Sequence, residues 1–218
     1  MGKEESVKAK LFQSIIGYVR ENHAETIDKA YEFFWDGNQP DEFLGGVALE
    51  LGFINFEDWL VFDYKVSGDN QTFIDMYMNT VQGLKEEEIS LLQKIKGSVL
   101  SLFEVASVAK DKRIRLKDLL LGNEYSLKDR TLTKGLKEGD IFASRLLVLD
   151  GSPCMSGCAY PFSASMKKRV LERINVEFGR YVRNVTKEGK MRDYLKNYGD
   201  IFNLIWMDFI LNPAEKTL

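Results

Sequence analysis

The chain has 218 residues, of which 44% are hydrophobic and 29% charged. This ordinary globular composition argues against a disordered chain, and no apolar run approaches the roughly 20 residues that cross a bilayer. The first residues also lack an apolar signal core, so we expect a cytoplasmic protein without a membrane span.

The net charge of −3 hides an uneven distribution along the chain. Residues 1–90 hold 7 Lys/Arg and 18 Asp/Glu, whereas residues 91–218 hold 23 and 15. The front of the chain is therefore acidic, at −11, and the back is basic, at +8. Such asymmetry indicates either a basic surface for polyanions or two halves that attract each other.

The first part of the chain, residues 1–96, has the pattern of a helical region. Apolar residues recur at the spacing of one helical face, which predicts helices over 5–20, 24–35, 72–80 and 85–96.

Residues 97–163 change to the alternating, β-branched pattern of strands. The predicted strands are 99–108, 112–117, the short runs on either side of the turn Gly122-Asn123, 141–149 and 155–162. About five short strands joined by turns favour a small antiparallel barrel or a strongly curled sheet.

The last part of the chain is helical again, with apolar stripes over 166–185 and 191–209. We therefore predict an α+β fold with an N-terminal helical part (1–96), a central β-barrel-like part (97–163) and a C-terminal helical pair (164–218). Because no flexible linker separates the three parts, we expect them to pack as one compact unit.

Several short motifs between residues 56 and 162 recur together in one group of proteins. They are Asp58-Trp59-Leu60, Phe62-Asp63-Tyr64, Ser101-Leu102-Phe103-Glu104-Val105, Leu116-Lys117-Asp118-Leu119-Leu120 with Gly122, Leu136 with Gly139-Asp140, and Ala143-Ser144-Arg145-Leu146. In their order the chain resembles uncharacterised prokaryotic proteins that often carry a SEC-C zinc motif at one end. The SEC-C motif itself is absent from this sequence, and the resemblance implies no reaction.

Cysteine and histidine are scarce in this chain. Cys154 and Cys158 are the only two cysteines and His23 is the only histidine, whereas a structural zinc takes four N or S ligands. We expect the cysteines to be small core residues of a hairpin and His23 to be a solvated residue at the start of a helix, with no metal site. No Ser-His-Asp arrangement and no phosphate-binding glycine loop can be assembled, so no cofactor is predicted.

The strongest acidic cluster is Glu57, Asp58 and Asp63, in the aromatic segment 53–64. These carboxylates could hold Mg²⁺ or act as an acid and base pair, which is the basis for the alternative of a metal-assisted enzyme. Asn55 is expected to cap a short helix there, and Asp58 is then more simply a first-turn acid stabilised by the helix dipole.

The basic residues provide the second set of candidates. Alternation places three cations on one face of a predicted strand, and region 166–196 carries 10 Lys/Arg against 4 Asp/Glu. The nucleic-acid-binding candidates are Arg113, Arg115, Lys117, Lys167, Lys168 and Arg173. Glutamates interleaved with these cations are also the pattern of an ordinary solvated helix face.

These patterns favour a non-catalytic interaction module that presents a surface to a macromolecule. Its partner is a protein, a second copy of the chain, or a nucleic acid bound through the basic half. The start of the chain also matches the myristoylation pattern through Gly2 and Ser6, which leaves modification of Gly2 open.

Overall fold

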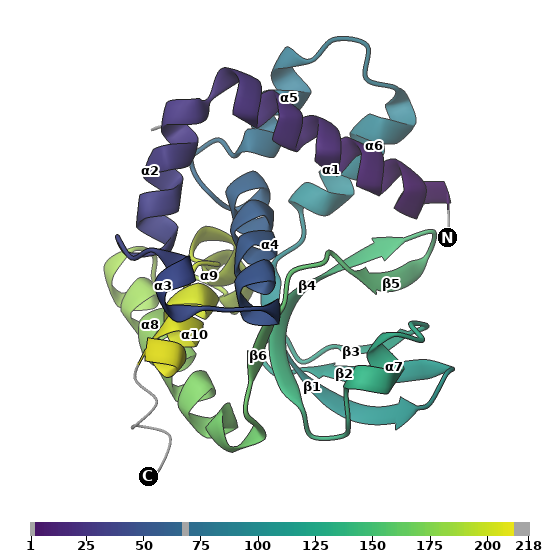
Figure 1. Cartoon of the computed structure of the whole chain (residues 1–218), viewed down its shortest axis with the longest axis vertical. Coiled ribbons are helices and arrows are strands. Elements are labelled where there is room, and N and C mark those ends of the chain that lie inside the picture. The colour runs from purple at the N-terminus through teal and green to yellow at the C-terminus, as the bar shows by residue number, and fades with distance from the viewer. Residues whose placement is uncertain (1–2, 67–69, 212–218) are drawn as a thin grey trace. The chain divides into compact units, whose positions relative to one another are not determined.

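Figure 1 shows the computed structural model of the chain, which describes residues 3–66 and 70–211. Gly2 lies outside the described residues. The chain divides into two compact units: unit 1 comprises Met1–Ser98 and Leu147–Ser152, and unit 2 comprises Val99–Leu146 and Pro153–Leu218. Unit 1 holds 9 Lys/Arg and 19 Asp/Glu, and unit 2 holds 21 and 14, so the acidic and basic charges fall on different units.

Unit 1 is built from helices (Figure 1). Its described elements are α1 Lys3–Asn22, α2 Ala24–Phe34, α3 Pro40–Phe43, α4 Val47–Phe62, α5 Phe73–Thr80 and α6 Glu86–Lys96. The predictions for α1, α2, α5 and α6 are confirmed to within two residues at each end. Across both units, no helix of the described residues is long and apolar enough to cross a membrane.

The prediction that Asn55 caps a short helix is wrong. Asn55 lies in the middle of α4, which runs for 16 residues from Val47 to Phe62, and its side chain is fully buried. The last turns of α4 bury Trp59, Leu60 and neighbouring apolar residues. This second half of α4 lies in the core, and its burial overrides the preference of Asn for helix starts.

Unit 2 carries most of the antiparallel sheet, which forms a nearly closed barrel (Figure 1). Its strands are β1 Leu100–Ala109, β2 Arg113–Asp118, β3 Glu124–Leu127, β4 Ile141–Leu149, β5 Ser152–Met155 and β6 Tyr160–Phe162. The end of β4 and the first residue of β5 fall in unit 1. The order is β3-β2-β1-β4-β5, and β6 pairs with β4. The α+β prediction with a small antiparallel barrel is confirmed, although the predicted run 155–162 is divided between β5 and β6.

The barrel core explains the alternation seen in β2. Ile114 and Leu116 are buried against Phe103, Val105 and Phe142. The residues between them therefore face outward, and Arg113, Arg115 and Lys117 are exposed.

The C-terminal helices of unit 2 are α8 Lys167–Asn184, α9 Met191–Asn197 and α10 Ile201–Leu211, preceded by a short 3₁₀ turn, Ala164–Met166. The second predicted stripe is thus interrupted, because the backbone leaves the helical region at Tyr198 and resumes at Ile201. Helix α10 packs on β6, where the rings of Tyr160 and Trp206 lie 5.8 Å apart.

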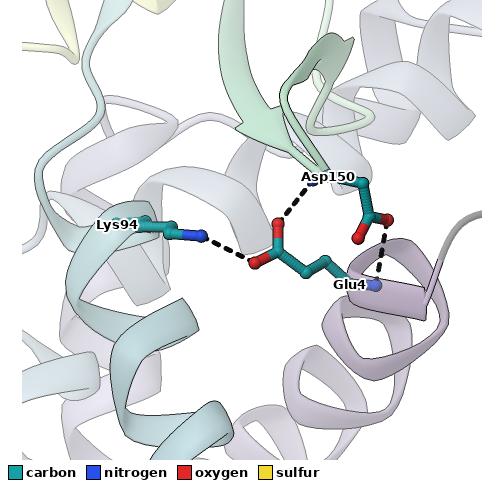
Figure 2. A network of polar contacts seen from close by, with 3 residues as sticks. All are labelled: Glu4, Lys94 and Asp150. Atoms are coloured by element: carbon teal, nitrogen blue, oxygen red, sulfur yellow. Dashed lines mark hydrogen bonds and ion pairs between the residues drawn. The ribbon is translucent and has the colours of Figure 1, made fainter.

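The turn between β4 and β5 belongs to unit 1. Figure 2 shows its residue Asp150 bonded to Glu4, which Lys94 also contacts. It is a two-residue turn, with positive φ angles at Asp150 (48°) and Gly151 (70°). The Asp150 carboxylate accepts the N–H of Glu4 at 3.1 Å, and the Glu4 carboxylate accepts the N–H of Asp150 at 2.5 Å and Nζ of Lys94 at 2.6 Å. The hydrogen bonds from Lys94 and from Asp150 hold the pKa of Glu4 below its usual range.

Candidate nucleic-acid interface

The three acidic candidates do not share one environment. The Glu57 side chain is 34% exposed and binds the Arg20 guanidinium at 2.9 Å. Asp58 and Asp63 are instead buried, at 3% and 4% exposure. Within the described ranges, no group of three or more His, Cys, Asp or Glu side chains could hold a metal ion. The geometry therefore does not assemble Glu57, Asp58 and Asp63 into a magnesium site.

His23, Cys154 and Cys158 are each at least half-buried. His23 precedes α2, as expected, but it is half-buried and not solvated. Its Nε2 lies 3.3 Å from the hydroxyl of Tyr18, and its ring also contacts the ring of Phe73. Cys158 is buried and Cys154 is half-buried, and the two are not joined by a disulfide. The thiol of Cys158 accepts a hydrogen bond from the hydroxyl of Ser156 at 3.2 Å.

The three strand candidates lie together on the outer face of β2, but acidic residues accompany two of them. The pairing register places Lys117 opposite Glu104 of β1 and opposite Glu124 of β3. Glu124 also accepts a hydrogen bond from the Arg115 guanidinium at 3.3 Å. Because cross-strand neighbours of opposite charge interact, this row offers little free positive charge.

The three helix candidates also face carboxylates in unit 2. Lys167 binds Glu104 at 2.6 Å, Lys168 lies 3.8 Å from Glu172, and Arg173 lies 4.0 Å from Asp208. Exposed ion pairs of this kind stabilise a fold by only about 0–1 kcal/mol, but they lower the positive potential that a polyanion would meet. The six predicted residues therefore do not form one free basic surface.

A different group of cations forms a basic surface, at the end of the β1–β2 hairpin. We call it the hairpin-end patch, and its members are Lys110, Lys112, Arg113, Lys128, Arg130 and Lys134. All six residues are exposed, and their side chains make no hydrogen bond or ion pair with any residue that the structure describes. Of these six, only Arg113 was among the predicted candidates.

Strand pairing and one long-range hydrogen bond bring these residues together. Arg113 is paired with Ala109 at the end of β1, and Lys128 directly follows Leu127, which is paired with Ile114 of β2. Arg113 and Lys128 therefore lie at the same end of the paired strands.

The turn between β1 and β2 is fixed to α7 (Leu132–Gly135), which contacts β2 (Figure 1). The N–H of Asp111 donates to the hydroxyl of Thr133 at 3.1 Å, and Asp111 has a positive φ of 58°, which Asp tolerates better than most residues. The Asp129 carboxylate in turn accepts the N–H groups of Thr131 and Leu132 at 2.8 and 3.0 Å. These bonds hold Arg130 and Lys134 beside the hairpin.

The charge balance of the patch is strongly positive. Segments 110–113 and 128–134 contain 6 Lys/Arg and only two acids, Asp111 and Asp129. The Asp129 carboxylate is occupied by backbone N–H groups. A cluster of like charges on one end of a basic unit creates a positive potential that attracts polyanions.

Comparison with known proteins gives a family without an assigned function. A model described as a family of unknown function (DUF7986) matches residues 7–197, a range that includes the whole hairpin-end patch. A search of curated proteins and a search of solved structures each find no match. The match supports the expected likeness to an uncharacterised family and bears in no way on the SEC-C motif.

Proposed function

This chain belongs to the family of unknown function DUF7986, and we propose that it is a non-catalytic interaction module that binds nucleic acid through the hairpin-end patch. The observation that carries the proposal is the gathering of six exposed cations whose side chains have no hydrogen-bond or ion-pair partner among the described residues. Phosphate groups, spaced regularly and fully charged, are the partners that such a group attracts most strongly.

The composition of the patch favours contact with the nucleic-acid backbone over the reading of bases. Segments 110–113 and 128–134 contain no aromatic residue on which a base could stack. Arg113 and Arg130 each carry a planar guanidinium group that can bind a phosphate through two hydrogen bonds, whereas the lysines act as point charges. We therefore expect binding that depends little on sequence and strongly on salt.

The decisive measurement is the salt dependence of affinity for a single-stranded RNA and a DNA duplex of about 20 nucleotides, followed by fluorescence anisotropy. Each phosphate contact contributes a log–log slope of about −0.7 on single strands and about −0.9 on duplexes. Six contacts to a single strand would give a slope of about −4. The substitution Lys112→Ser, Arg113→Ser, Arg130→Ser should flatten it by roughly two units.

A variant with the same change of charge provides the control. Lys168→Ser, Arg183→Ser, Lys187→Ser removes three cations from α8 and the turn that follows it, and should leave most of the slope. Equal flattening by both variants, or no binding of either nucleic acid at about 50 mM salt, would contradict the proposal. Stronger binding of poly-glutamate than of RNA or DNA would instead indicate an acidic protein partner.

The alternative of a metal-assisted enzyme at Glu57, Asp58 and Asp63 gains no specific support. It needs three carboxylates that converge on one ion, and Glu57 is engaged by Arg20. Among the residues described, no three metal-ligating side chains come together.

A further inference from the structure

A pocket of about 380 Å³ lies between α8, α9 and α10 of unit 2, away from the segments of the hairpin-end patch in the sequence. This volume falls in the range of sites that hold small molecules or single side chains. The lining residues that matter here are Glu177, Tyr181, Tyr194, Tyr198 and Asp200.

The three tyrosine rings form one contacting cluster in the pocket. The rings of Tyr194 and Tyr198 are stacked with centroids 5.4 Å apart, and Tyr181 meets Tyr198 edge to face at 5.7 Å. Tyr194 is 3% exposed whereas Tyr198 is 41% exposed, so the cluster has a buried base and one accessible ring. The face of an aromatic ring is electronegative and attracts cations.

Two carboxylates add negative charge beside these rings. The Glu177 side chain is 26% exposed, and its partner Arg180, at 2.7 Å, is 60% exposed, so the carboxylate is the more enclosed member of the pair. Burial raises the pKa of Tyr194, and the charges of Glu177 and Asp200 raise it further. Both carboxylates therefore act on the same ring that forms the base of the cluster.

Two arginines, Arg173 and Arg180, also line the pocket, and each has a carboxylate partner. Arg180 is exposed and is already paired with Glu177. Arg173 lies near Asp208, and both residues line a second hollow of about 230 Å³. The contact between Arg180 and Glu177 also shows that this carboxylate accepts a guanidinium group in the folded chain.

From these contacts we infer that the pocket between α8, α9 and α10 binds a guanidinium group, which pairs with the carboxylate of Glu177, in the pocket that Asp200 also lines, and stacks on the ring of Tyr198. A ligand guanidinium takes the place of Arg180 at Glu177, and the loss is small because exposed pairs three residues apart on a helix are weak. The site is separate from the proposed nucleic-acid surface and does not depend on it.

Titration calorimetry with N-acetyl-arginine amide tests the inference, with N-acetyl-citrulline amide as an uncharged probe of the same shape. We expect the arginine derivative to bind at least about tenfold more tightly, because only the charged group pairs with carboxylates. A pentapeptide with one central arginine distinguishes the two sources of the ligand: tighter binding of the peptide indicates a protein partner, and equal binding indicates a small molecule. Either result supports a guanidinium site.

Variants locate the site on the protein. Glu177→Gln should weaken arginine binding about tenfold and Tyr198→Leu about threefold, whereas Glu172→Gln, on the same helix outside this pocket, should leave it unchanged. Equal affinity for the two amides, no effect of Glu177→Gln, or tighter binding of inorganic phosphate that depends on Arg173 and Arg180 would overturn the inference. Thermal unfolding of each variant identifies any loss that comes from misfolding.

Discussion

Gly52 illustrates how closely unit 1 is packed around its aromatic residues. A Cβ atom at position 52 would lie 2.8 Å from Cη2 of Trp35 and 3.2 Å from Cδ1 of Leu44. Trp35 is fully buried and meets the ring of Phe34 edge to face at 5.0 Å. The indole is therefore held in place and cannot move aside for a methyl group.

We expect Gly52→Ala to destabilise the chain by roughly 1–2 kcal/mol. Overpacking a core costs about 1–3 kcal/mol, which exceeds the gain of up to about 1 kcal/mol from a better helix former. Gly17→Ala in α1 is the matched control, because no described residue beyond its chain neighbours and the backbone of its own helix lies within 4 Å of its Cβ position, and it should stabilise by about 0.5–1 kcal/mol. Urea unfolding followed by tryptophan fluorescence measures both, and a stabilising Gly52→Ala would contradict this account.

The start of α5 depends on reciprocal contacts between Thr72 and Asp75. The Asp75 carboxylate accepts the N–H of Thr72 at 3.1 Å and its hydroxyl at 2.8 Å, and it also pairs with Lys96 of α6. Burial alone would raise the pKa of Asp75, but the hydrogen bonds from Lys96 and Thr72 outweigh it and lower the pKa. One carboxylate thus caps one helix and ties it to the next.

Substitution of Asp75 should show a defined pH dependence. Because its pKa is lower in the folded chain than in the unfolded chain, its contribution is present above the unfolded pKa of about 3.9 and is lost as the pH falls through the folded pKa. Asp75→Asn should cost about 1 kcal/mol at pH 7, and the difference from the parent should shrink below pH 4. Asp28→Asn, on the exposed face of α2, should change stability by less than about 0.5 kcal/mol throughout.

The elements that the sequence predicted well are those with a single, sustained period. Helices α1, α2, α5 and α6 each carry one buried stripe, and burial of that stripe decides their state. The break between α9 and α10 was not predicted, because the apolar stripe continues at helical spacing through Tyr198 to Phe209. Only Gly199 marked the interruption in the sequence.

The hairpin-end patch could be predicted only in part, for a related reason. Alternation along β2 placed Arg113 on the outer face, and this is confirmed. Lys128, Arg130 and Lys134 lie in another segment, which reaches the hairpin because Asp111 bonds to Thr133, 22 residues away. A contact between a turn and a four-residue helix leaves no periodic signal in the sequence.

At the scale of the whole molecule, charge was the most informative property of the sequence. The acidic front and basic back of the chain correspond to the two units, with −10 on unit 1 and +7 on unit 2. The correspondence is incomplete, because residues 147–152 return to unit 1. Residues 147–152 are joined to unit 1 by the hydrogen bonds between Glu4 and Asp150. The amino-acid composition of the chain cannot indicate such a contact.

The bond from Glu4 to Asp150 also affects the order of events during synthesis. The first N–H groups of a helix lack partners within the helix, and α1 receives one of its partners from a residue 146 positions later. At about 5–20 residues per second, the ribosome takes roughly 7–30 s to reach Asp150 after Glu4.

Proteolysis of ribosome-arrested chains should detect the delay. Chains halted before residue 150 has emerged should be cut near Glu4 faster than released chains, and equal rates would contradict the expectation. We therefore expect enzymes that act on nascent chains to meet the start of α1 with a frayed first turn, until the β4–β5 turn has emerged and can bond to Glu4.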